Sequence, residues 1–176
     1  MVRIMKFFAY TLFFISMLIY FMPKINAYYL LENTLKENSI VISDEELTDN
    51  GFSLDITNAS VFVKSIKSAN IQNINIKIFG FYNKISLKNI TLSKTMKSFI
   101  PLHVEDLNID YSIITPFSVN LNGVGEFGTF TAIFNIDKNS IKLQLNPSKT
   151  MFNNYKSTLK NLVKSENGEY IYEKNI

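Results

Sequence analysis

The chain has 176 residues, of which 47% are hydrophobic and 19% charged, and its formal net charge is +3. This length suits one domain, and the composition is too apolar for a disordered chain. The absence of cysteine excludes a disulfide framework, a thiolate zinc site, an iron–sulfur cluster and a cysteine nucleophile. Arg3 and Lys6 supply two of the positive charges, so the remainder is nearly neutral and predicts no nucleic-acid partner.

The first predicted element is an apolar helix. Residues 7–23 read FFAYTLFFISMLIYFMP and contain no charged side chain. At about 1.5 Å per residue this stretch reaches about 25 Å, near the short end of what spans a bilayer. The apolar run therefore predicts that residues 1–25 form a membrane anchor. Arg3 and Lys6 precede it, which predicts a cytoplasmic N-terminus and export of the remaining chain.

Two alternatives to an uncleaved anchor remain. A signal peptide would have a shorter apolar core and small residues before its cleavage site. The segment Ile25-Asn26-Ala27 places alanine at one such position but isoleucine at the other. The second alternative is a helix buried in the core of the domain.

Residues 26–38 predict a short connecting helix, since they lack Gly and Pro. Tyr28, Leu31 and Leu35 fall on one helical stripe. The helix either lies near the membrane surface or packs on one end of the domain that follows.

From residue 39 the apolar period changes to two, which is typical of strands with one buried face. The sequence predicts eight to ten short antiparallel strands, and the region 39–176 is predicted to be one β-domain. The alternation shifts by one residue between Leu87 and Ile90 and between Val104 and Leu107. Such a shift requires a bulge or a tight corner if the apolar side chains are to stay on one face. The alternating apolar residues include Phe52, Leu54, Ile56, Ile74, Ile76, Ile78, Ile85, Leu87, Leu107, Ile109, Val119, Leu121, Phe130, Ala132, Phe134, Ile141, Leu143 and Leu145.

The hexapeptide GVGEFG at 123–128 matches the glycine spacing of dinucleotide-binding loops. Such a loop must open a helix, whose N-terminus holds the pyrophosphate. The residues that follow, TFTAIFNID, alternate and are rich in β-branched and aromatic types, which favours a strand. We therefore predict that Gly123, Gly125 and Gly128 serve a hairpin, bulge or bend, and that no nucleotide binds there.

The C-terminal region predicts an amphipathic helix at 148–163 and a closing strand at 169–173. Ser148 is a candidate N-cap, and Asn167-Gly168 is a stop signal. The apolar stripe of the helix would cover its own sheet or bind a partner helix. The stripe consists of Met151, Phe152, Tyr155, Leu159, Leu162 and Val163.

Candidate catalytic and metal-binding residues are few. His103 is the single histidine, and a relay with Asp106 or Asp110 lacks a nucleophile elbow. The acidic run Asp44-Glu45-Glu46 with Asp49 offers oxygen ligands but not the EF-hand spacing. We assign no catalytic, cofactor-binding or metal-binding residue, expect no cofactor, and predict that the chain is not an enzyme.

Three segments carry a family resemblance: the anchor ending in FMP at 21–23, ISDEELTDNGFSLDITNASV at 42–61, and LQLNPSKTMFNNYKSTLKNLVKSENGEYIY at 143–172. The layout resembles type II secretion system protein N and its AsmA-like relatives, and more weakly the LptC-like periplasmic β-jellyroll proteins. The resemblance implies a mainly β fold: a transmembrane helix, a short helix, and a curved antiparallel sheet, groove- or jellyroll-like, with an amphipathic helix near the C-terminus.

The same resemblance implies a function and a location. The expected function is that of a non-enzymatic, inner-membrane-anchored periplasmic component of a bacterial envelope assembly. A lipid or lipopolysaccharide transport module is the alternative. The implied partners are the membrane and envelope proteins, with a lipid under the alternative. The implied location is the bacterial inner membrane, crossed once, with the C-terminal domain in the periplasm.

Overall fold

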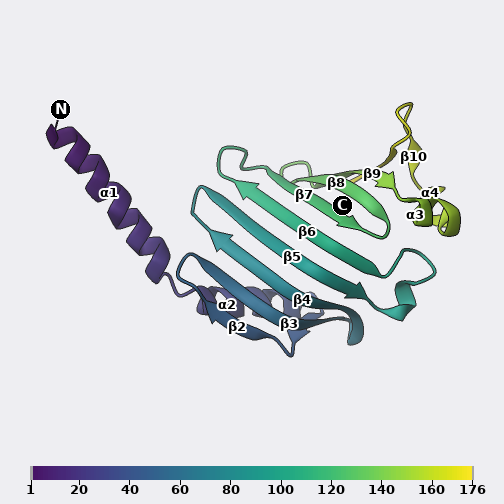
Figure 1. Cartoon of the computed structure of the whole chain (residues 1–176), viewed down its shortest axis with the longest axis horizontal. Coiled ribbons are helices and arrows are strands. Elements are labelled where there is room, and N and C mark those ends of the chain that lie inside the picture. The colour runs from purple at the N-terminus through teal and green to yellow at the C-terminus, as the bar shows by residue number, and fades with distance from the viewer. Residues whose placement is uncertain (1, 176) are drawn as a thin grey trace.

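A computed structural model describes residues 2–175, in which a long N-terminal helix projects from a broad β-sheet (Figure 1). The projecting helix α1, Val2–Phe21, has no buried residue. It has the length and hydropathy of a membrane span, and a signal sequence would share both properties. A break at Met22-Pro23 separates it from α2, Lys24–Glu37, because a proline favours a helix start but cannot continue the helix before it.

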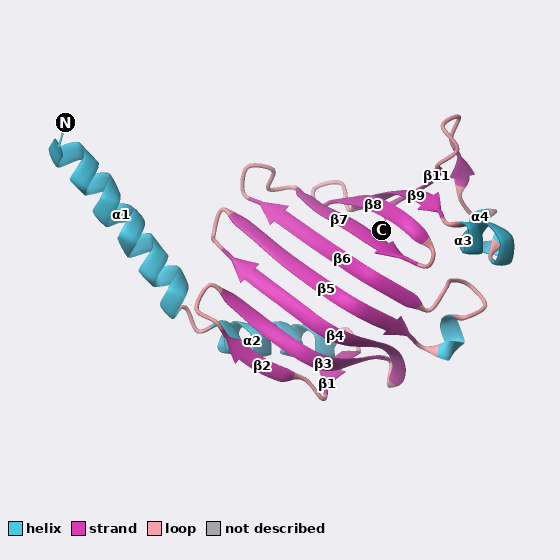
Figure 2. Cartoon of the chain, in the orientation of Figure 1, coloured by secondary structure: helices cyan, strands magenta, loops and turns pink. Residues whose placement is uncertain are grey.

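Eleven antiparallel strands form one curved, open sheet (Figure 2). This confirms the predicted mainly β fold and shows an open sheet. Its strands are β1 (Ile40–Ser43), β2 (Glu46–Asp49), β3 (Ser53–Val63), β4 (Ile66–Ile78), β5 (Tyr82–Leu92), β6 (His103–Ser112), β7 (Ser118–Gly125), β8 (Gly128–Asn135), β9 (Ser140–Pro147), β10 (Val163–Lys164) and β11 (Tyr170–Asn175).

Neighbours in the sheet are mostly neighbours in the chain, in the order β1-β3-β4-β5-β6-β7-β8-β9-β11-β10. At one edge, β1 and β2 pair with successive halves of β3. Asp44, with a φ of 67°, lies between them. At the other edge, β10 pairs with only the first two residues of β11.

The strand ends define two ends of the sheet. The end where α1 joins, called the anchor-side end, carries the loops 49–52, 79–81, 113–117 and 136–139. The opposite end, called the far end, carries the turns 64–65 and 126–127, the loop 93–102 with its 3₁₀ turn Lys94–Met96, and the C-terminal helices. Figure 1 shows α1 leaving the sheet from the anchor-side end.

A line of irregular residues crosses four strands and explains the predicted one-residue shifts. Asn58 and Asn89 have φ values of 59° and 53°, and Asn89 donates to the Oε1 of Gln72 on β4 at 3.0 Å. On β6 the pairing with β7 shifts between Val104 and Asp106. The irregularities therefore lie within β3–β6 rather than between strands. They keep the apolar residues on both sides of the line facing one way.

The prediction of a single C-terminal helix at 148–163 is wrong. The structure has two short helices, α3 at Lys149–Asn154 and α4 at Lys156–Leu159. Tyr155 separates them with φ −123° and ψ 38°, and the preceding Asn153 and Asn154 are weak helix formers. The predicted N-cap is confirmed, since Ser148 Oγ accepts from the Met151 N–H at 3.0 Å. The predicted closing strand is β11.

Candidate functional site

The pairing register places the apolar residues of the strands in rows across one face of the sheet, called here the apolar face. Directly paired residues share a face, so each row can be followed from strand to strand. One row runs Leu54, Ile76, Ile85, Ile109, Leu121, Ala132, Leu143. The next row runs Ile56, Ile74, Leu87, Leu107, Gly123, Phe130, Leu145.

One side of the apolar face is covered by α2. This helix packs along β1–β3, and Leu54 and Ile56 beneath it are each only 1% exposed. Tyr28 of α2 is buried, and its hydroxyl donates to Glu45 Oε1 at 3.2 Å. Burial first, and then the Glu45 carboxylate, raise the pKa of Tyr28 far above its usual value, so α2 is held to the sheet by a neutral phenol.

The far end of the apolar face is closed by further residues of the same hydrophobic core. Phe127 from the β7–β8 turn, Met151 of α3 and Leu159 of α4 are buried in the cluster that also contains Val104 and Leu145. The Thr158 hydroxyl also donates to the Phe99 carbonyl at 2.6 Å, which ties α4 to the β5–β6 loop. Met151 and Leu159 of the C-terminal apolar stripe therefore pack on the chain's own sheet, which was one of the two alternatives that the sequence left open.

Between these covers the apolar face is open. Among residues 2–175 the main helix–strand contacts join α2 to β1, β2 and β3, and α3 to β9. Nine apolar side chains of this face in β6–β9 are half-buried. Leu107 and Phe130 lie in the row nearer the far end, and the other seven, nearer the anchor-side end, form what we call the open apolar patch. Its members are Ile109, Tyr111, Val119, Leu121, Phe134, Ile141 and Leu143.

A small cavity under α2 extends the open apolar patch. It has a volume of about 100 Å³ and is lined by Lys24, Ala27, Tyr28, Leu31, Leu54, Ile76, Ile78 and Ile85. Ile85 is paired with Ile109, so the cavity and the patch are adjacent. The amide oxygen of Asn83, in the same face, is buried and has no hydrogen-bond partner among the described residues.

A buried lysine joins α1 to the sheet beside this cavity. Lys24 is 1% exposed, and its Nζ donates to the carbonyls of Ile19, Tyr20 and Met22 at 3.1, 3.3 and 3.2 Å. It also lies 3.5 Å from Asp49 Oδ1. The lysine therefore satisfies the orphan carbonyls at the C-terminus of α1 and links them to the β2–β3 turn.

The opposite face of the sheet is polar, and its side chains bond to one another across strands. Ser86 donates to Asn108 at 2.7 Å, and Asn108 donates to Asp106 at 2.5 Å. Asn75 and Asn50 both donate to the Asp55 carboxylate. The alternation of polar and apolar residues along each strand therefore places the polar side chains on this face, toward water, and the apolar side chains on the other face.

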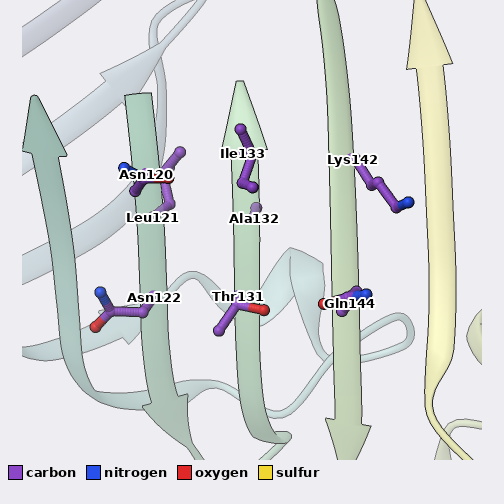
Figure 3. Close-up of a pocket in the computed structure, with 8 residues that line it drawn as sticks. All are labelled: Asn120, Leu121, Asn122, Thr131, Ala132, Ile133, Lys142 and Gln144. Atoms are coloured by element: carbon purple, nitrogen blue, oxygen red, sulfur yellow. The ribbon is translucent and has the colours of Figure 1, made fainter. Parts of the chain in front are cut away.

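A shallow hollow of about 360 Å³ lies on the polar face of β7–β9 (Figure 3). It is lined by Asn120, Leu121, Asn122, Thr131, Ala132, Ile133, Lys142 and Gln144. In Figure 3 the side chains of Asn122 and Lys142 point away from one another. No carboxylate or imidazole lines the hollow, so its residues supply no general acid–base pair.

The sequence-predicted catalytic candidates are not brought together. His103 begins β6 and pairs with Thr91, while Asp106 lies three residues along, about 10 Å away at strand spacing. Asp106 accepts from Asn108, and Asp110 accepts from Tyr82. The hydrogen bond to Asp110 raises the pKa of Tyr82. A His–Asp relay is therefore not formed.

The acidic run is likewise divided between structural roles. Glu45 binds Tyr28 and Asp49 binds Lys24, whereas Asp44 occupies the corner between β1 and β2. Within residues 2–175 no group of three or more His, Cys, Asp or Glu side chains is placed to hold a metal ion.

The glycine hexapeptide forms a hairpin, as predicted. Gly125 ends β7, Glu126-Phe127 make the turn and Gly128 begins β8 with a φ of 112°. A Cβ atom at Gly128 would lie 2.1 Å from the Asn146 carbonyl oxygen, which explains the glycine there. A strand, not a helix, follows the motif.

No family model matches the chain, and neither the curated proteins nor the solved structures contain a significant match.

Proposed function

We propose that the chain is a membrane-anchored, non-enzymatic lipid-binding protein, and that the open apolar patch takes up the acyl chains of a lipid outside the bilayer. The observation that carries this proposal is the open apolar patch itself. In a closed domain a second layer would cover such a face, because a one-sided sheet must bury its apolar side. An acyl chain can serve as that layer without demanding hydrogen bonds.

The patch is wider across the strands than along them. On β6 it extends from Ile109 to Tyr111, about 7 Å at strand spacing, and it covers the four neighbouring strands β6–β9, about 14 Å at the usual separation of strands. The next apolar row, with Leu107 and Phe130, continues the apolar face toward Phe127 and Met151 at the far end. A segment of a hydrocarbon chain of this size fits the patch.

The position of the patch also suits a lipid that leaves the bilayer. Lys24 ties the end of α1 to the sheet at the same end where Tyr111, Val119 and Phe134 lie. If α1 spans a membrane, the patch begins next to the lipid surface. A lipid would then move along the apolar face without crossing water.

A photoreactive phenylalanine analogue at Leu121 tests the proposal in intact cells. The side chain of Leu121 shares the apolar face with its paired residues Ile109 and Ala132, while the next side chain, Asn122, points to the opposite, polar face. The proposal predicts a lipid adduct at position 121 and none at position 122. The pair Leu143 and Gln144 repeats the comparison on β9. Equal adducts on the two faces, or none at 121 and 143, would overturn the proposal.

We propose further that α1 stays attached as a single span and that residues 24–176 lie outside the cytoplasm. Arg3 and Lys6 precede the apolar run, and basic residues favour the cytoplasmic side. In bacteria this corresponds to the inner membrane and the periplasm. Protease added to cells with a permeable outer membrane should cut the β-domain, and a full-length N-terminus by mass would exclude cleavage as a signal peptide.

A second candidate function is that of a component of an envelope assembly resembling the type II secretion system. One observation favours it: β10 covers only Tyr170 and Ile171 of β11, so the outer edge of Tyr172–Asn175 has no strand partner among the described residues. Free edges can accept a strand from another protein. Loss of secreted enzymes on deletion, with unchanged envelope lipids, would favour this candidate over lipid binding.

A further inference from the structure

The anchor-side loops carry a row of exposed apolar side chains that the open apolar patch does not include. They are Phe52 (42% exposed), Phe81 (61%), Ile113 (56%), Ile114 (84%), Phe117 (59%) and Ile136 (47%). Turns normally carry polar residues and glycine, so apolar side chains in four successive anchor-side loops need an explanation. We call these six residues the loop edge.

Backbone hydrogen bonds join three of these loops, 79–81, 113–117 and 136–139, to one another. The Ile113 N–H donates to the Phe81 carbonyl at 3.1 Å, and the Ile136 N–H donates to the Phe117 carbonyl at 2.8 Å. Pairing between loops satisfies part of their backbone polar groups without water. This matters in a medium of low polarity, where each unpaired backbone group is costly.

The loop edge is continuous with the end of α1. The Tyr20 ring lies edge-on to the Phe52 ring, with a centroid separation of 5.3 Å, and it also lies against Gly51. Figure 1 shows the loops between β4 and β5 and between β6 and β7 at the strand ends nearest to α1. A bilayer that surrounds α1 would therefore meet these loops first.

Charge distinguishes the loop edge from the far end. The anchor-side loops contain only Asp49, Asp137 and Lys138 as charged residues, and Asp49 is paired with Lys24. The far-end segments 64–65, 93–102, 126–127 and 148–169 contain seven lysines and three glutamates. A nearly uncharged apolar edge suits immersion in the acyl region beneath the headgroups, whereas the lysine-rich end suits water or headgroups.

We infer that the loop edge inserts into the same bilayer that α1 spans, so that the sheet rests on the membrane by its strand ends. The occupant is the lipid surface. It is favoured over a second copy of this chain because α1 emerges from this end of the sheet and brings the bilayer with it. The inserted edge holds the sheet with its strands directed away from the membrane and opens the apolar patch at the lipid surface.

Tryptophan reporters test the inference cleanly because the chain contains no tryptophan. Phe81→Trp probes the loop edge, and Phe99→Trp is its matched control at the far end, since both phenylalanines are 61% exposed. Each full-length variant is placed singly in nanodiscs whose lipids carry brominated acyl chains, which quench only tryptophans within the hydrocarbon. Ile114→Trp provides a second reporter in the next loop.

The inference predicts blue-shifted, strongly quenched emission for Phe81→Trp and Ile114→Trp, and unquenched emission for Phe99→Trp. Circular dichroism verifies that each variant is folded. Equal quenching at positions 81 and 99, or no quenching at 81 and 114, would overturn the inference. It does not depend on lipid binding at the open apolar patch, since a failed adduct at Leu121 with quenching at Phe81 would reject that function and leave the membrane contact intact.

Discussion

The part of the apolar face beneath α2 and the open apolar patch consist of similar apolar residues, but only the first is covered by a helix. Leu54 and Leu121 belong to the same row across the sheet, yet Leu54 is 1% exposed under α2 while Leu121 is half-buried and has no helix above it. Ile56 and Ile109 differ in the same way. A strand's sequence therefore determines which face is apolar, and a separate element determines whether that face is closed.

We expect the covered part of the apolar face to contribute mainly to stability and the open apolar patch to contribute mainly to function. The covered part supplies buried apolar area that stabilises the fold. The open part gains less from folding and remains available to a ligand. Substitutions that place the same charge in the two parts should therefore differ in their effect on stability.

Ile56→Asp should have the largest effect, a loss of more than about 3 kcal/mol in the free energy of unfolding. The change removes a fully buried apolar side chain and leaves a carboxylate without a partner under α2. Denaturant unfolding of the full chain in detergent, followed by the circular dichroism of the sheet, measures it. A midpoint equal to that of the wild type would show that α2 does not close this part of the face.

Gly128→Ala should cost about 2 kcal/mol, since it combines a strained positive φ with a clash against the Asn146 carbonyl. The hairpin at Gly128 positions Phe127 in the cluster that closes the far end. Gly80→Ala is the matched control: its φ is also positive, at 77°, but no atom lies within 4 Å of the added Cβ. Equal losses in the free energy of unfolding for the two variants would show that the clash with the Asn146 carbonyl does not contribute.

Leu121→Asp should cost about 1 kcal/mol or less, because a half-buried side chain can keep its carboxylate in water. The contrast with Ile56→Asp is the point of this experiment. A loss as large as that of Ile56→Asp would show that the open apolar patch is closed in solution, and the proposed lipid function would fall with it.

His103→Ala should change stability by no more than about 0.5 kcal/mol and leave the cellular phenotype unchanged. The imidazole lies on the polar face, about 10 Å along the strand from Asp106. A complementation assay in a deletion strain measures the phenotype. Loss of complementation by a folded variant would reopen a catalytic role for this histidine.

Much of the sheet could be predicted from alternation alone. The shift between Leu87 and Ile90 marked the irregularity at Asn89, and Ser148 marked a helix start. The length of the C-terminal helix was wrong because the apolar stripe outweighed the weak propensity of Asn153 and Asn154. A periodic pattern reports a face and does not report where the backbone stops being helical.

Two features of the candidate site could not be predicted from the strand pattern. The Lys24–Asp49 contact joins residues 25 positions apart, separated in the chain by α2, β1 and β2, and no local signal specifies it. The patch is open because α2 covers only the strands β1–β3, and the alternation within a strand does not report how far a separate helix extends over the sheet. The loop edge did have a signal, since Phe81 and Ile114 are large apolar residues at turn positions.

Native mass spectrometry of the full chain released from detergent tests the central claim most directly. The account predicts that the wild-type chain and Asn122→Asp retain equal amounts of bilayer lipid, whereas Leu121→Asp, folded and equally pure, retains less. Asn122→Asp controls for added charge on the same strand, and lipid bound to α1 is common to all three proteins, so it does not contribute to the difference. Equal lipid retention by the three proteins would contradict the account.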